Sequence, residues 1–287
     1  DINDVNPKEA AIAIVNRIKE RGELPFHWFR NIIKSPTWYV QVVEEMKKMD
    51  KSICLLDAPS FFELLRIYLK ENAPFAGGTG SREDPFLIST PQQFDNIRRY
   101  RSQCFQLVND LDFSDYVRED GQSWWPLGEW GSGDKALERF SGFFDGSGYS
   151  IRNLSVERKA HDLSIFGVTE GAEIVNLKVE NCKIIGEGRL GVLTGATFST
   201  KIEQVCVLNS QCENRLSDHG SNAGGLTGPL YRSVVKSCSI QGGNVYAKDC
   251  VGGISSSMSK DSKIIDCYSN CRIEGIINVG GMTGKVN

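Results

Sequence analysis

Residues 151–287 carry the clearest pattern in the chain, a series of alternating apolar and polar segments that each lead into a glycine-rich box. The four boxes are Gly191–Gly195, Gly224–Gly228, Gly252–Ser256 and Gly280–Gly284, with central apolar residues at Leu193, Leu226, Ile254 and Met282. These centres are spaced by 33, 28 and 28 residues, and a degenerate box, Ile165-Phe166-Gly167, lies 27 residues before the first. A fixed period of this length indicates supersecondary units that stack on one another.

The segments upstream of the boxes predict β-strands. Apolar and polar residues alternate in Ile174–Val179, Ile202–Leu208, Val234–Ile240 and Ile264–Ser269. Period two is typical of a strand, and no helical period separates these segments. The sequence therefore predicts a mainly β fold, in which 151–287 form a right-handed parallel β-helix, or solenoid, with tight glycine turns. Because the last box lies three residues from the end of the sequence, we expect the solenoid to be truncated at its C-terminus.

Residues 75–150 predict a linker followed by the start, or cap, of the solenoid. The stretch Ala73–Ser81 is rich in Pro, Gly and Ser, which marks a boundary. Thr90 and Pro91 provide a cap and a first helical residue for a helix that we expect to reach Tyr100. Phe105–Val108 predicts a strand. A solenoid needs an element that shields its first turn, and a helix with aromatic strands suits that role.

Residues 1–74 show a different pattern, with elements in the order α-β-α-β-α. The two predicted strands are Phe26–Ile33 and Ile53–Leu56. Two strands and three helices cannot close an α/β sheet that is buried on both faces. We therefore expect an incomplete α/β segment that either caps the solenoid or is the tail of a larger upstream domain. We favour the second, so that the chain is a piece of a longer protein. Asp57 follows the second strand, where a helix N-cap accounts for it as well as a site would.

The glycine boxes and the phrase Asp266-Cys267-Tyr268-Ser269 resemble GLUG repeats, which occur in bacterial surface proteins and adhesins. Asp84–Ile88 and Phe144–Tyr149 resemble the usual lead-in to those repeats, so the resemblance covers about 77–287. The third box departs from it, with Ser255-Ser256 where Thr-Gly is expected. The resemblance implies a β-helix and a role in cell-surface adhesion.

The first segment resembles the C-terminal end of a family of bacterial glycoside-hydrolase-like proteins that is named for a GxGYxYxP motif. Phe29–Ile33, Ser35-Pro36 and Leu56–Leu65 carry this resemblance, whereas the naming motif is absent. It implies carbohydrate metabolism and brings no catalytic residue with it.

The nine cysteines do not predict a disulfide framework or a metal site. Their number is odd, and no C-x-x-C pair occurs. The three histidines, His27, His161 and His219, are scattered, so we expect no metal and no cofactor. Leu177, Cys206, Cys238 and Cys267 occupy one aligned position in the repeats, where we expect unpaired thiols to fill a narrow interior as small hydrophobes.

Charge and hydropathy narrow the possible partners. The net charge of −3 gives no basic surface for nucleic acid, and we interpret Arg98, Arg99 and Arg101 as a solvated face. No run of eighteen apolar residues occurs, so the sequence predicts no transmembrane helix. Together with the resemblance to surface proteins, this favours a secreted or cell-surface location.

Three tryptophans and a glutamate are the candidate binding residues. Trp124, Trp125 and Trp130 lie with Glu129 on a stretch rich in Asp and Gly. Aromatic faces stack on sugar rings, with acidic and amide groups beside them, so we expect a polysaccharide or a cell-surface molecule as the ligand. The alternative is that these aromatic residues form the core of the cap.

Two other functions remain open from the sequence. A β-helix hydrolase or lyase would need two carboxylates across a cleft, and its candidates are Asp110, Asp112, Glu129 and Asp145. Turn chemistry accounts for three of these four, all except Glu129, and no carboxylate recurs at one aligned position of the repeats. We therefore assign no catalytic residue and favour a non-catalytic module attached to a glycoside-hydrolase-like protein. A purely structural stalk is the third possibility.

Overall fold

A computed structural model describes residues 44–45, 48, 74–118, 121–130, 138–216 and 220–287. The chain divides into two compact units, Asp1–Ala73 and Pro74–Asn287. In the first unit only Glu44, Glu45 and Lys48 are described, and all three are helical. The α/β order predicted for 1–74, including its strands and Asp57, otherwise lies outside the described residues.

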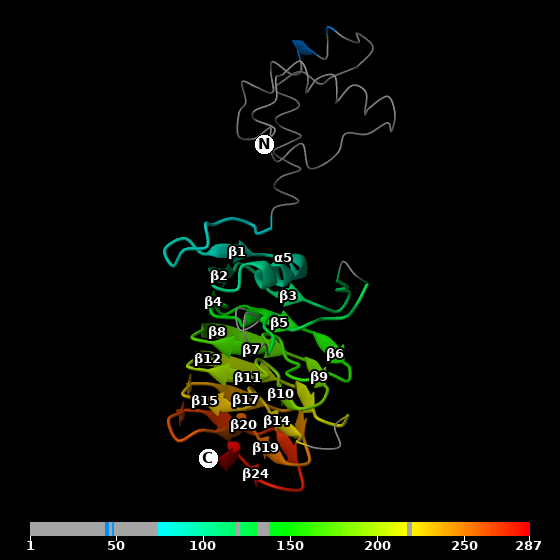
Figure 1. Ribbon diagram of the computed structural model, residues 1–287, viewed down its shortest axis with the longest axis vertical. Helices are drawn as coiled ribbons and strands as arrows, with labels where there is room; N and C mark the ends of the chain where they lie inside the picture. The colour runs from blue at the N-terminus through cyan, green and yellow to red at the C-terminus, as the bar shows by residue number, and fades with distance from the viewer. Residues whose placement is uncertain (1–43, 46–47, 49–73, 119–120, 131–137, 217–219) are drawn as a thin grey trace. The chain divides into compact units, whose positions relative to one another are not determined.

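The second unit is mainly β, as predicted, and its named strands all pair in parallel (Figure 1). They form four sheets. The first sheet follows the order β1 (Phe86–Ile88), β2 (Cys104–Leu107), β4 (Phe143–Asp145), β8 (Glu173–Glu180), β12 (Lys201–Leu208), β16 (Val234–Lys236) and β21 (Lys263–Ile265). Beside this path lie β3 (Leu111–Asp112), β5 (Ser150–Arg152), β17 (Ser239–Gln241) and β22 (Tyr268–Ser269).

The third and fourth sheets take one strand from each of five successive turns of the chain, and the second sheet takes one from each of the last four. The second sheet comprises β10 (Arg189–Gly191), β14 (Asn222–Gly224), β19 (Cys250–Gly252) and β24 (Val279–Gly280). The third comprises β7 (Val168–Glu170), β11 (Ala196–Phe198), β15 (Leu230–Tyr231), β20 (Ser255–Met258) and β25 (Thr283–Val286). The fourth comprises β6 (Ser155–Glu157), β9 (Lys183–Ile185), β13 (Gln211–Glu213), β18 (Asn244–Tyr246) and β23 (Arg272–Glu274).

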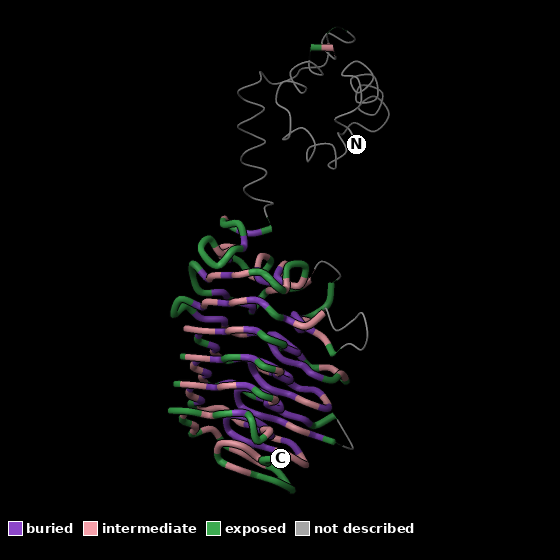
Figure 2. The backbone as a smooth tube through the Cα atoms, turned by 60° about the vertical axis from the view of Figure 1, so that its left-hand side comes forward, coloured by how far each residue is buried: buried purple, intermediate pink, exposed green. Residues whose placement is uncertain are grey.

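The chain visits these sheets in a constant order and returns to pair with the previous repeat. After β8 it passes through β9, β10 and β11 before β12 pairs with β8. Ile174, Ile202 and Val235 are successive in-register partners, so each repeat lies directly against the next (Figure 2). The spacing of the glycine boxes therefore does correspond to a stack of repeats.

Backbone hydrogen bonds join the box centres in the predicted register. The amide of Leu193 donates to the carbonyl of Leu226 at 2.8 Å, and the amide of Leu226 donates to that of Ile254 at 3.0 Å. Glycine is needed in the boxes because neighbouring backbones come very close there. A Cβ on Gly225 would lie 2.2 Å from the carbonyl oxygen of Gly253.

The predicted helix begins at the expected cap and covers the first strands with an aromatic side chain. In α5 (Pro91–Asn96), the hydroxyl of Thr90 accepts the amide of Gln93 at 3.2 Å. A 3-10 turn, η3 (Ile97–Arg99), ends the helix one residue before the predicted end. Phe94 is fully buried among other aromatic rings, which fill this part of the interior. These rings are Phe105, Phe113, Trp124, Phe140, Phe144 and Phe166.

The predicted cysteine column is wrong by one residue at Cys206. Its in-register partners are Lys178 and Ser239, so it is displaced from the interior position, which Val205 takes instead. Val205 directly follows a corner of the chain at Gln204, which adopts a φ of 56°, and Cys206 lies one residue further along. The same corner recurs in the other repeats at Asn176, Ser237 and Asp266. The eight described cysteines are all free thiols.

Candidate functional site

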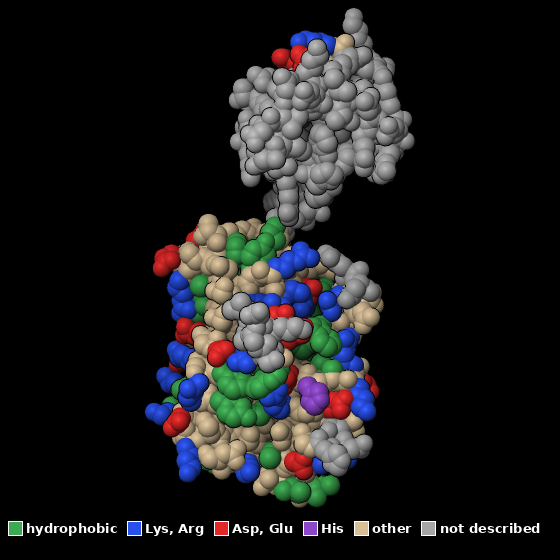
Figure 3. Space-filling model, viewed as in Figure 1, with side chains coloured by type: hydrophobic (Ala, Val, Ile, Leu, Met, Phe, Trp, Pro, Cys, Tyr) green, Lys and Arg blue, Asp and Glu red, His purple; other side chains and the backbone are tan. Residues whose placement is uncertain are grey.

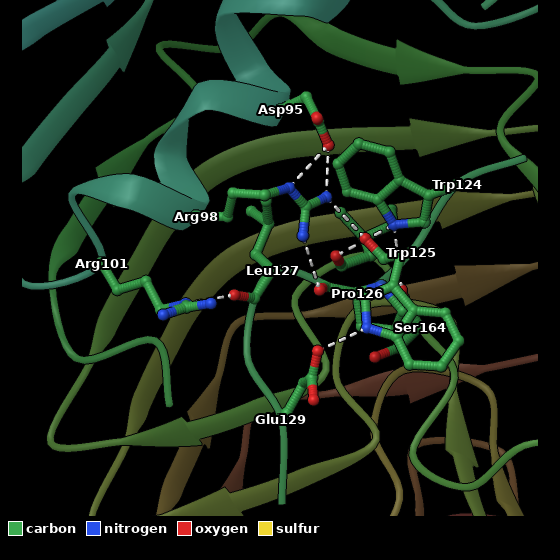
Figure 4. A network of polar contacts seen from close by, with 10 residues as sticks. Asp95, Arg98, Arg101, Trp124, Trp125, Pro126, Leu127, Glu129 and Ser164 are labelled. Carbon is green, nitrogen blue, oxygen red and sulfur yellow. Dashed lines mark hydrogen bonds and ion pairs between the residues drawn. The ribbon is translucent and has the colours of Figure 1, made fainter. Parts of the chain in front are cut away.

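The tryptophan segment is fixed by one arginine of η3 and one of the turn that follows. Arg98 donates from Nη2 to the carbonyl of Trp125 at 2.9 Å and from Nη1 to that of Pro126 at 3.2 Å, and it pairs with Asp95 (Figure 4). Arg101 donates from Nε to the carbonyl of Leu127 at 2.7 Å. The interpretation as a solvated face is therefore wrong for Arg98 and Arg101, whereas Arg99 is exposed. Arg98 and Arg101 hold a backbone segment in place.

Trp124 lies in the core and offers no face to a ligand. Its side chain is 2% exposed and packs against Phe94 and Phe113. Its indole Nε1 donates to the carbonyls of Ser164 and Ile165, both at 3.3 Å. For this residue the structure agrees with the alternative, the core of the cap, and we leave it out of the candidate site.

The other three candidate residues line one cleft of about 430 Å³. Trp125 and Glu129 are joined by a hydrogen bond of 2.6 Å from the indole Nε1 to Oε1. Trp130 is 49% exposed and lies on the same cleft. The arginine anchors explain this arrangement, because they fix the backbone so that Trp124 points inward while Trp125 reaches the cleft.

Two charged residues that sequence reasoning missed complete the cleft. Arg189 donates from Nε and Nη2 to the two carboxylate oxygens of Asp162, both at 2.7 Å. Its guanidinium carbon lies 3.8 Å from the ring centroid of Trp130. A signal was present in the sequence, since each residue lies four positions before the centre of its box, Phe166 or Leu193. Opposite charges at one aligned position of consecutive repeats indicate an ion pair.

A row of aromatic side chains continues from the cleft along the outer surface of the third sheet. The ring centroids of Trp130 and Phe198 are 5.4 Å apart, and those of Phe198 and Tyr231 are 4.8 Å apart with an angle of 9° between the planes. Figure 3 shows hydrophobic side chains gathered on this face, over β11 and β15. The aromatic surface therefore extends over more than one repeat.

The remaining carboxylates proposed for an enzyme serve turns and do not line the cleft. Hydrogen bonds from Ser114 and Asn153 lower the pKa of Asp112 to about 2. The backbone amide of Ser150 lowers the pKa of Asp110. Asp145 accepts the amide of Ser147 at 2.7 Å and the side-chain amide of Asn176 at 3.1 Å. The structure therefore does not bring these residues together with Glu129.

The cleft is equipped for recognition more than for proton transfer. Its two carboxylates, Glu129 and Asp162, already accept strong hydrogen bonds from an indole and a guanidinium. A carboxylate in such a pair is held in one orientation. Within the part of the chain that the structure describes, no group of His, Cys, Asp and Glu could hold a metal ion.

The chain is similar to parts of two curated proteins from microorganisms. It is 34% identical over 144 residues to a protein of Evansella cellulosilytica named "Putative Gly-rich membrane protein". This alignment covers 48% of this chain and 16% of that protein. The chain is 29% identical over 131 residues to halomucin of Haloquadratum walsbyi, which covers 43% of this chain and 1% of halomucin. The chain thus spans only a small part of each relative. No family model matches it.

One solved structure is similar in outline. It is described as that of a "putative immunoglobulin A1 protease" from Bacteroides ovatus, with 17% identity and a TM-score of 0.44 over 71% of this chain and 80% of that one. A likeness at this level supports no conclusion about activity. Among the described residues, no helix is long and apolar enough to cross a membrane.

Proposed function

We propose that the second unit is a right-handed β-helix module of a secreted or cell-surface protein, and that it binds polysaccharide without catalysing a reaction. The stack of parallel strands supports the β-helix, and the names of the relatives are those of a membrane protein and a mucin-like protein. In the longer protein, the module would follow the segment that resembles glycoside-hydrolase-like proteins.

The observation that carries the proposal is the meeting of Trp125, Glu129 and Trp130 on one cleft. Large aromatic side chains usually supply buried area, so an exposed Trp130 and a partly buried Trp125 beside fixed polar groups require an explanation. Binding sites combine apolar walls with a few placed polar groups, and this cleft has both. The aromatic row at Phe198 and Tyr231 would lengthen the contact for a polymeric ligand.

A binding assay with matched variants tests the proposal. The full chain would be incubated with insoluble polysaccharides of different composition, with tryptophan fluorescence followed alongside. We expect saturable binding that changes the fluorescence, and a loss of affinity of about tenfold or more in a Trp125→Ala/Trp130→Ala variant, equivalent to roughly 1.4 kcal/mol. Tyr149→Ala is the control, because Tyr149 is an exposed aromatic residue that does not line the cleft.

Three outcomes would contradict the proposal. Binding that is unchanged in the double tryptophan variant would place the site elsewhere on the module. Absence of saturable binding to every polysaccharide would favour a stalk or a protein partner. Release of soluble sugar from a bound polysaccharide would instead favour the β-helix enzyme.

A further inference from the structure

Two cysteines of consecutive repeats lie side by side at the corner of the first sheet. Ser239 of β17 is the in-register partner of Tyr268 of β22, and Cys238 and Cys267 immediately precede these residues. The amide of Tyr268 donates to the carbonyl of Cys238 at 3.0 Å, which fixes the register at this point. The two cysteines are therefore direct neighbours across the repeat boundary.

The geometry brings the two thiols together. Each cysteine follows a residue with a φ of 51°, Ser237 or Asp266, so the two chains turn in the same way at this corner. Each thiol lies against the carbonyl of the residue two positions before it, at 3.2 Å from Lys236 for Cys238 and 3.2 Å from Ile265 for Cys267, so the two side chains are placed in the same way. Neighbouring parallel strands lie about 4.8 Å apart, which is within the Cα separation of roughly 4.4–6.8 Å that a disulfide requires.

The two thiols have different surroundings. Cys238 is 1% exposed, whereas Cys267 is only partly buried and can meet a reagent from solution. The neighbouring thiol of Cys238 lowers the pKa of Cys267 to about 7, whereas the thiol of Cys267, together with burial, raises the pKa of Cys238. Cys267 is therefore partly a thiolate near neutral pH, and the thiolate is the reactive form of cysteine.

The other described cysteines on named strands have different in-register neighbours. Cys104 pairs with Phe143, Cys212 with Ile184 and Val245, and Cys250 with Asn222. Cys206 lies beside Lys178 and Ser239. Among these strand pairings, none places a second thiol opposite the first.

We propose that Cys238 and Cys267 are a site of covalent cross-linking, where a disulfide oxidant such as oxidised glutathione joins two consecutive repeats. The thiolate of Cys267 attacks one sulfur of the oxidant, forms a mixed disulfide and releases one glutathione thiolate. Cys238 gives up its proton and attacks the sulfur of Cys267, and the second glutathione leaves as a thiolate. The protein loses two electrons and two protons, and the oxidant is reduced to two thiols.

The cross-link would tie down the most exposed part of the repeats. Ile276 is 74% exposed and Val286 is 60% exposed, and both belong to the turn of chain that follows Cys267. A disulfide between neighbouring repeats restricts the unfolded chain and would prevent the last repeat from separating from the one before it.

The test is to incubate the full chain with oxidised glutathione, block the remaining thiols with iodoacetamide, digest without reduction and map disulfides by mass spectrometry. We expect one dominant linked peptide pair containing Cys238 and Cys267, and a protein lighter by two hydrogens before alkylation. Cys206→Ser should leave this product unchanged. Cys267→Ser should abolish this linked product. After treatment with oxidised glutathione, the thermal midpoint of the variant should be as low as that of the reduced wild type.

A glutathione adduct that persists on Cys267 in the wild type would overturn the proposal, because the second attack would then have failed. Dominant linkage to any other cysteine would overturn it as well. Since both results come from the wild-type protein, they do not depend on whether a serine variant folds.

Discussion

The two ends of the second unit fill their interiors with different kinds of side chain. In residues 74–170, here called the aromatic region, the core contains Phe94, Phe105, Trp124, Phe144 and other rings. In residues 171–287, the repeat region, the buried apolar side chains among the described residues are aliphatic or cysteine, with no aromatic ring. One region depends on large side chains, and the other depends on close approach of backbones at the glycine boxes.

This difference explains where the candidate site lies. Successive repeats place similar side chains at each aligned position, which leaves little freedom to build an asymmetric cleft. The aromatic region interrupts the repeat with α5 and with the segment that Arg98 and Arg101 hold, and this segment presents Trp125 to the surface. The cleft lies where this irregular segment meets the first repeats, at Asp162 and Arg189.

The largest effect is expected from removing a ring in the aromatic region. Phe94 is fully buried and contacts the rings of Phe113, Trp124, Phe144 and Phe166, with centroid separations of 5.5–5.8 Å. Phe94→Ala should lower the free energy of unfolding by about 3–5 kcal/mol, because the cavity cannot collapse among rigid rings. Urea denaturation followed by tryptophan fluorescence measures this change.

The control for this variant is Tyr149→Ala, since Tyr149 is 38% exposed in the same region. A change within about 0.5 kcal/mol is expected there. A loss below about 1 kcal/mol in Phe94→Ala would mean that the helix is not part of the core, and the comparison of the two regions would fail.

A smaller effect is expected from a matched pair of glycines in the repeat region. Gly225 and Gly281 occupy the same position of their boxes. A Cβ on Gly225 would lie 2.2 Å from the carbonyl oxygen of Gly253, whereas one on Gly281 would meet nothing within 4 Å. Gly225→Ala should cost about 1–3 kcal/mol in urea denaturation through overpacking, and Gly281→Ala should be close to neutral. Equal costs would show that glycine serves only the local turn and not the contact between repeats.

The repeat region could be predicted from sequence because its signal is periodic. The spacing of the box centres gave the register that the hydrogen bonds at Leu193, Leu226 and Ile254 show. The same method failed at Cys206, because the sequence of the segment does not show that the corner lies at Gln204 and that Val205, the residue directly after it, takes the interior position. A position of left-handed φ occupied by Gln carries no local signal comparable to glycine.

The candidate site was predictable only in part for a related reason. Composition pointed to Trp125, Glu129 and Trp130, yet it could not separate them from Trp124, which is adjacent in sequence and buried. That separation depends on the carbonyls that Arg98 holds, a contact across 27 or 28 residues with no periodic signature.

The smallest effect that distinguishes the regions concerns two carboxylates whose pKa values are lowered by different partners. In the aromatic region, Asp112 accepts neutral hydrogen bonds from Ser114 and Asn153, which lower its pKa to about 2. In the repeat region, Lys201 and Lys236 lower the pKa of Glu203, with N–O distances of 2.8 Å and 3.0 Å. Each carboxylate favours the folded state above its ordinary pKa and loses that contribution as the pH falls through its lowered value.

Salt should separate the two cases. At about 1 M ionic strength the screening length falls to roughly 3 Å, so the exposed lysines lose much of their influence on Glu203. We expect its pKa to rise toward its ordinary value of 4.5, while that of Asp112 stays about 2 because neutral donors are not screened. Carboxyl ¹³C NMR titrations at low and high salt measure both values. A parallel rise at Asp112 would mean that Arg152, rather than Ser114 and Asn153, lowers its pKa, and the aromatic region would then hold its turn carboxylates as the repeat region does.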